Sequence, residues 1–204
     1  MNILHVDSSA LGSASVSRQL TADIVARLRQ AHPQAQVVRR DLSATALPHL
    51  DGELLQVVKF QDVANLTDRQ KGELTLSTEL LEEFLAADIV VIGAPMYNFG
   101  VPSQLKAWVD RIAQPGRAFR YTAAGPEGLA GGRRVIVASS RGGKYAGTAY
   151  EGAMDHQEAF LTAFLGFIGI TDIQVVRAEG VAMGPEAQAA ALDEAKAQIA
   201  ALAV

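Results

Sequence analysis

The chain has 204 residues, of which 49% are hydrophobic and 20% charged, and its formal net charge is −4. This mildly acidic balance argues against nucleic acid or an anionic membrane as a main partner, because both require a basic face. The chain contains no cysteine, which excludes disulfides, thiolate nucleophiles, zinc–thiolate sites and iron–sulfur clusters. A length near 200 residues fits one domain, so we expect a single domain over residues 1–204.

The N-terminal segment MNILHVDSS has no positively charged start and only a short apolar run, so we expect no signal peptide. The chain also has no run of 18 apolar residues, the length that a membrane-spanning helix requires. These features predict a cytoplasmic protein.

Short, β-branched runs alternate with helical patterns along the whole chain. We expect buried strands at residues 2–7, 35–42, 87–93, 133–140 and 172–180. The helical patterns between and after them are expected at residues 16–32, 67–86, 105–112, 160–168 and 185–203. Thr67 is a plausible N-cap of the second helix, and Pro185 suits the first turn of the last.

Strands that alternate with helices need crossover connections, which predict an α/β protein with a parallel sheet. Five strands in about 200 residues favour the doubly wound, flavodoxin-like order 2-1-3-4-5. Ligands of such sheets bind outside the carboxyl ends of the strands, where the strand order reverses. The loops after the first, third and fourth strands are therefore the places to look for function.

The loop after the first strand, DSSALGSASVSRQL, is rich in serine and leads directly into a helix. Unpaired N–H groups at a helix N-terminus, together with serine hydroxyls, can hold a phosphate. A serine-rich capping loop without a ligand is the alternative. The chain has neither GxxxxGK[ST] nor GxGxxG, which argues against a nucleoside triphosphate or a dinucleotide bound through a Rossmann fingerprint.

Two further loops have residues suited to contact a flat ligand. The third strand runs into GAPMYNFGVP (93–102), which places Met96, Tyr97 and Phe99 where water should reach them. The fourth runs into SSRGGKYAG (139–147), whose paired glycines allow close backbone approach and whose Arg141 adds a cation. A phosphate loop with two loops flanking a flat ring predicts a mononucleotide site, and FMN has this shape. Inward packing of Met96 or Phe99, and an ordinary strand-to-helix turn at 139–147, remain alternatives.

Over nearly its whole length the chain resembles the FMN-dependent NADH-azoreductases, a branch of the flavodoxin-like quinone reductases. The motifs that carry this resemblance are DSS with SVS, APMYNFGVPSQLKAW, FRYTAAGPEGLAGGRR, SSRGG and FLGFIGITD with AEG. The resemblance implies non-covalent FMN, NADH or NADPH as co-substrate, and a homodimer whose two sites are lined by both chains. It also implies quinones and azo dyes as acceptors in a ping-pong reaction.

The resemblance also implies a set of site residues. Phosphate-binding residues would be Ser9, Ser15, Val16 and Ser17; ring-binding residues would be Pro95, Met96, Tyr97, Asn98 and Phe99; residues at the pyrimidine side would be Ser140, Arg141, Gly142 and Gly143. Phe60, Phe119 and Tyr121 are the candidates for closing the substrate pocket over the flavin.

We expect no metal and no side chain that acts as acid, base or nucleophile, since the flavin carries the chemistry. His5 and His32 read as structural, and His49 and His156 as solvated. The alternative function is a flavodoxin-type electron carrier that docks on a redox partner protein. Such carriers are usually shorter and more acidic, and the segment at residues 43–80 has no purpose in a carrier.

Overall fold

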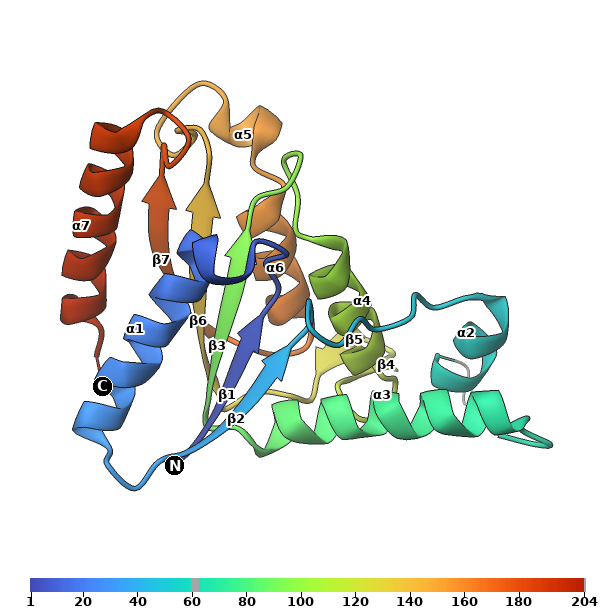
Figure 1. Cartoon of the computed structure of the whole chain (residues 1–204). Coiled ribbons are helices and arrows are strands. Elements are labelled where there is room, and N and C mark those ends of the chain that lie inside the picture. Colours follow the sequence, from blue (N-terminus) through green and yellow to red (C-terminus); the bar gives the residue numbers. More distant parts are fainter. Residues whose placement is uncertain (60–62, 204) are drawn as a thin grey trace.

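A computed structural model describes residues 1–59 and 63–203 (Figure 1). Its main sheet is parallel and has five strands, in the order β2-β1-β3-β6-β7. These strands are β1 (Asn2–Asp7), β2 (Gln36–Asp41), β3 (Ile89–Pro95), β6 (Arg134–Arg141) and β7 (Asp172–Glu179). Since β6 and β7 are the fourth and fifth strands of this sheet along the chain, the expected order 2-1-3-4-5 is confirmed.

Helices cover both faces of the sheet (Figure 1). One face is covered by α1 (Val16–Ala31) and α7 (Pro185–Ala201). The other face packs against α3 (Asp68–Ala86), α4 (Ser103–Ile112) and α6 (Gln157–Phe167). The two faces form separate cores because the sheet lies between them, and its central strand β3 is buried along its entire length. Trp108 on α4, fully buried, packs edge-on against Phe84 on α3 in the second core.

Local sequence signals set the ends of these helices. Thr67 caps α3 in a complete capping box with Gln70, as expected from the sequence. Pro185 stands at the start of α7, where a missing N–H costs nothing. Ser15 caps α1 by accepting a hydrogen bond from the N–H of Arg18. Because Ser15 is the N-cap, the unpaired N–H groups of α1 belong to the residues that directly follow it.

Several short elements were not expected from the sequence. They are η1 (Gly12–Ala14), α2 (Gly52–Val58), α5 (Glu151–Met154) and an antiparallel hairpin of β4 (Phe119–Thr122) and β5 (Gly125–Gly128). The hairpin depends on a long-range contact: a Cβ at Gly128 would lie 2.1 Å from the Gly169 nitrogen, so only glycine fits. Because Gly169 precedes β7, this contact places the β5 end of the hairpin toward the amino ends of the strands.

None of the helices in the described part of the chain combines the length and the apolar character that crossing a membrane requires.

Candidate functional site

A pocket of about 310 Å³ opens at the carboxyl ends of β1, β3 and β6, where the sequence predicted a ligand site. It is lined by Ser9, Leu11, Ala14, Ser15, Val16, Pro95, Met96, Tyr97, Ser140, Gly142, Val181, Ala182 and Gln188. None of these side chains is charged. The pocket therefore has an apolar wall with a few hydroxyl and amide groups, which is typical of a cofactor site.

The N-terminus of α1 supplies hydrogen-bond donors to this pocket. The N–H of Ser15 bonds to the Gly12 carbonyl and that of Arg18 to Ser15 Oγ, at 3.3 Å. The N–H groups of Val16 and Ser17 have no partner among the hydrogen bonds of the described residues, as expected at the start of a helix. Ser17 is fully buried, with its hydroxyl 3.1 Å from Ser15 Oγ. These donors and the helix dipole suit an anion.

Tyr97 connects the first loop to the loop after β3. Its hydroxyl lies 3.2 Å from Ser9 Oγ and accepts a hydrogen bond from the N–H of Ala10, also at 3.2 Å. Ser8 Oγ adds a bond of 2.6 Å to the carbonyl of Gly93. The two loops are thus held together before any ligand binds.

The loop after β3 makes a tight turn in which two non-glycine residues adopt left-handed backbone conformations. Tyr97 and Gly100 exchange hydrogen bonds across the turn, and between them Asn98 has φ 47° and Phe99 has φ 70°. Asparagine tolerates this region, whereas a phenylalanine there is strained. Phe99 is also 44% exposed. It therefore does not pack inward on the core, which was one alternative reading of this loop.

The loops after β6 and β7 are joined by backbone hydrogen bonds. The carbonyls of Arg141, Gly142 and Gly143 accept from the N–H groups of residues 180–182. Ser140 O accepts from the N–H of Met96 at 2.8 Å. Within the described part of the chain, the N–H groups of the two glycines have no such partner. They remain free to donate to a ligand.

Arg141 has a different position from the one expected. The side chain is fully buried, and its guanidinium bonds to carboxylates of Asp155, Glu158 and Glu179 at 2.6, 2.7 and 2.9 Å. Glu179 also accepts from the backbone N–H of Tyr145. The expectation of a cation offered to the ligand is corrected here, because the charge is fully used in holding the 142–146 loop. Only the backbone of Arg141 is left for a cofactor.

Of the three candidates for the substrate pocket, the two that the structure describes are not brought to the site within one chain. Phe60 lies outside the described residues. Phe119 is buried on β4, with its ring 4.6 Å from that of Phe167 and 5.6 Å from that of Tyr121. Tyr121 is 75% exposed on the same hairpin, which packs against α6 and lies away from the loops after β1, β3 and β6 (Figure 1).

Sequence reasoning missed one wall of the pocket. Val181, Ala182 and Gln188 come from the loop after β7 and the first turn of α7. The sequence did contain a signal for this loop, since it has a glycine at each end, Gly180 and Gly184. Both adopt positive φ in the structure. The rule that selected the other three loops applies equally to a fifth parallel strand.

None of the four histidines lines the pocket, and only the backbone N–H of His156 contacts the ring-binding loop within the described residues, at the Phe99 carbonyl. His5 is 8% exposed and pairs with Asp7 at 3.2 Å. Burial pushes the pKa of Asp7 upward, but bonds from His5, Arg39 and Thr21 outweigh it and hold this pKa below its usual value. His49 and His156 are exposed, as expected. The described residues offer no histidine for proton transfer in the pocket.

A second hollow, of about 390 Å³, lies near the amino ends of β1 and β2 beside the end of α3. Its lining is largely apolar and includes Ile3, Leu4, Val38 and Ala87. It has neither a free helix N-terminus nor a set of converging hydroxyl groups. The pocket at the carboxyl ends is therefore the better candidate.

Fold and pocket together define a flavodoxin-like protein with a mononucleotide site at the point where the strand order reverses. The model of a family described as "Flavodoxin-like fold" matches residues 1–203, and the chain belongs to this family. It is 64% identical over 204 residues to the FMN-dependent NADH:quinone oxidoreductase of Azospirillum brasilense, covering 100% of this chain and 98% of that protein. The enzyme of the same name from Polaromonas naphthalenivorans is 53% identical over 197 residues, covering 97% and 91%.

Solved structures agree with this placement. An azoreductase from Bacillus anthracis superimposes with a TM-score of 0.88 at 27% identity, covering 99% of this chain and 100% of that one. An FMN-dependent NADH-azoreductase from the same species, solved in complex with FMN, gives 0.88 at 26% identity over 100% of both chains. The resemblance inferred from the motifs is thus confirmed. These relatives are named as enzymes, which disfavours the electron-carrier alternative.

The residues of the pocket fit FMN. A terminal phosphate suits the free N–H groups of Val16 and Ser17 beside buried hydroxyls, and no carboxylate in the lining repels it. A flat ring suits the wall formed by Pro95–Tyr97 on one side and Ser140 and Gly142 on the other.

Proposed function

We propose that this chain is an FMN-dependent oxidoreductase that transfers hydride from NADH or NADPH to quinones and azo compounds, the latter being cleaved to amines. The observation that carries the proposal is the uncharged pocket, which combines a free helix N-terminus with a flat wall. Identity of 64% to an enzyme named for this reaction supports it.

In this proposal FMN binds without a covalent bond. Ser9, Ser15, Val16 and Ser17 hold the phosphate through two backbone N–H groups and three hydroxyls. Each hydrogen bond to a charged group contributes about 1.5–3 kcal/mol. FAD carries no terminal phosphate, so it should bind poorly.

The two ring-binding segments have separate tasks. Residues 95–99 form one side, where the N–H groups of Asn98 and Phe99 in the strained turn have no backbone partner among the described residues. Residues 140–143 form the pyrimidine side, where the free N–H groups of Gly142 and Gly143 are placed to stabilise negative charge. When bound, FMN supplies the acceptance and release of hydride.

We further propose a homodimer in which the partner's hairpin closes the pocket. Tyr121 is 75% exposed, and Leu11, Phe99, Tyr150 and Met183 are also exposed, each at 44% or more. Apolar surface of this extent favours an interface. Docking of a second chain would bring its Tyr121 to the open side of the pocket, in addition to Tyr97, which lines the pocket within the same chain.

A ping-pong order fits a single pocket. NADH and the acceptor would bind in turn at the same open side, since the chain has no second nucleotide fingerprint. Selection of the acceptor then depends on stacking and shape, with the second proton taken from water.

The test is steady-state turnover of the FMN-loaded protein with a panel of quinones and azo dyes, run with each nicotinamide. The matched variants are Ala14→Asp, which places a carboxylate at the exposed rim of the phosphate end, and Ala26→Asp, on the exposed side of α1. Ala14→Asp should lose FMN and activity, and Ala26→Asp should keep both. Full FMN binding without turnover of any acceptor would contradict the proposed function.

A further inference from the structure

Beneath the first loop, Arg18 holds the backbone of Ser9. Its Nε and Nη2 donate to the Ser9 carbonyl at 3.2 and 2.9 Å. Nη1 and Nη2 also donate to the two carboxylate oxygens of Asp41, at 2.6 and 2.7 Å. One guanidinium thus connects α1, the end of β2 and the loop that carries Ser9.

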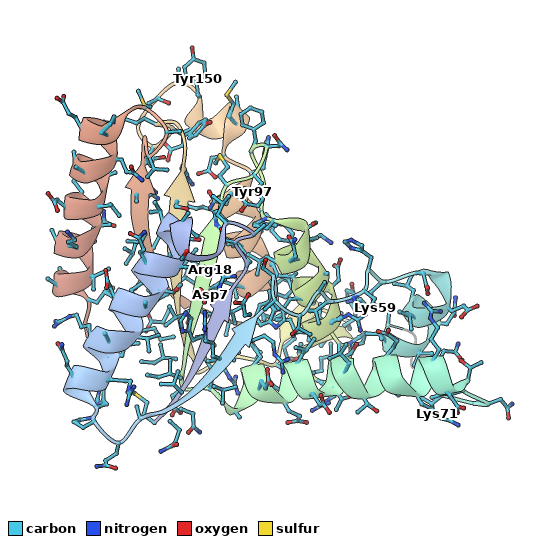
Figure 2. All side chains as sticks on the ribbon, in the orientation of Figure 1. Asp7, Arg18, Lys59, Lys71, Tyr97 and Tyr150 are labelled. Carbon is cyan, nitrogen blue, oxygen red and sulfur yellow. The ribbon has the colours of Figure 1, made fainter. Side chains whose placement is uncertain are left out.

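The charges of this cluster balance one another. Asp7 is 1% exposed and pairs with Arg39 at 2.9 Å, while Arg18 lies 3.5 Å from the same carboxylate. Two arginines and two aspartates therefore compensate each other, and neither arginine lines the pocket. Figure 2 shows Arg18 and Asp7 together below Tyr97, whose hydroxyl contacts Ser9 Oγ at 3.2 Å.

We propose that Arg18 is a positioning residue for FMN, a role that rests on the function proposed above. The Arg18 guanidinium fixes the Ser9 carbonyl and so orients the Ser9 hydroxyl toward the phosphate and orders the N–H groups of Ala10 and Leu11. Its charge is used on Asp41 and is not offered to the phosphate. Asp41 contributes to the same role, because its two bonds to Arg18 orient the guanidinium group.

The alternative role, direct attraction of the phosphate by the Arg18 charge, predicts opposite results for two variants. Arg18→Lys keeps the charge but loses the planar fork, which lysine cannot reproduce. Asp41→Asn removes the competing carboxylate and leaves Arg18 only the more distant Asp7, which already pairs with Arg39. If charge acts directly, Arg18→Lys should bind FMN normally and Asp41→Asn more tightly. If position matters, both should bind FMN more weakly.

The experiment measures the dissociation constants of the apoprotein for FMN and for riboflavin, which lacks the phosphate. We expect Arg18→Lys and Asp41→Asn each to weaken FMN about tenfold, as one lost charge-assisted bond would, and to change riboflavin by less than about twofold. The control is Arg40→Gln, which breaks a similar two-bond pair, with Glu83, next to Asp41 on β2 but away from the loop. Arg40→Gln should bind both ligands as the wild type does.

Hydrogen exchange of the apoprotein tests the positioning role without any flavin. In Arg18→Lys the amides of Ala10 and Leu11, which bond to Tyr97 Oη and Ser9 Oγ, should exchange faster, and in Arg40→Gln they should not. Unchanged exchange together with unchanged FMN affinity in Arg18→Lys, or tighter FMN in Asp41→Asn, would overturn the inference. Failure of the wild type to bind FMN would instead overturn the proposed function, and exchange would still decide whether Arg18 orders the loop.

Discussion

The two parts of the proposed site differ in how far a single chain builds them. The cofactor part consists of loops at the carboxyl ends of adjacent parallel strands, and the sheet of β1, β3, β6 and β7 brings these loops together within one chain. The proposed substrate part depends on Tyr121, exposed on a hairpin that packs beside Gly169. The difference teaches that sheet topology is enough to assemble a cofactor pocket, whereas the proposed closure over a substrate depends on a second copy of the chain.

The largest expected effect concerns the buried arginine of the cofactor part. Arg141→Met leaves the carboxylates of Asp155 and Glu179 without their guanidinium partner in a buried position. Breaking such a pair costs about 3–5 kcal/mol, so the free energy of unfolding in urea should fall by about that amount. Arg120→Met, which breaks the exposed pair with Glu127 on the hairpin, is the control and should change stability little. Equal losses in the two variants would contradict the structural role of Arg141.

The phosphate end should show the next effect. Ser17→Ala removes a fully buried hydroxyl beside Ser15 and should weaken FMN by about 1–3 kcal/mol. Riboflavin affinity should stay the same, because the phosphate is the only part of the flavin that we propose contacts this serine. Titration of the apoprotein with FMN, FAD and riboflavin measures all three. Equal affinity of the wild type for these flavins would show that the serine loop does not recognise a phosphate.

The sequence predicts the cofactor part much better than the substrate part, for a physical reason. Buried parallel strands are continuous apolar runs, so their number and order, and hence the positions of three loops, follow from local patterns. The pairing of Arg141 with Asp155 and Glu179 joins residues up to 38 positions apart, and no local pattern indicates it. The hairpin was missed because FRYT has only four residues and GPEG lacks an apolar alternation, and packing of Gly128 on Gly169 stabilises it.

Acid should weaken the pair of Asp41 with Arg18, which holds the first loop. Hydrogen bonds from Arg18, together with those from the N–H groups of Ala44 and Ser43, lower the pKa of Asp41 from 3.8 to about 2. A lowered pKa contributes stability that is complete above about pH 4 and is lost as the pH falls through the folded value. The difference in unfolding free energy between wild type and Asp41→Asn should therefore be constant above pH 4 and shrink toward pH 2. Urea unfolding at several pH values checks this, and a difference that grows on acidification would refute it.

The smallest effect belongs to the substrate part. Tyr121→Ala should raise the Michaelis constant for a quinone or dye several-fold, since an aromatic pair contributes about 0.5–1.5 kcal/mol beyond the area that it buries. Tyr121→Phe should be nearly silent, because stacking and shape, and not the hydroxyl, are proposed to act. FMN affinity should not change in either variant. A loss of about 100-fold in rate with Tyr121→Phe would instead identify a proton donor.

The claim that one chain holds the cofactor while its partner closes the pocket can be tested by subunit mixing. Ala14→Asp subunits should not hold FMN but keep Tyr121, and Tyr121→Ala subunits hold FMN but lack the aromatic residue. In the mixed dimer, the FMN site of the second subunit receives Tyr121 from the first. We predict that these sites regain the wild-type Michaelis constant for a quinone, with one FMN bound per dimer. Mixed dimers that keep the raised constant of the Tyr121→Ala homodimer, or a fully active monomer in sedimentation at micromolar concentration, would contradict the account.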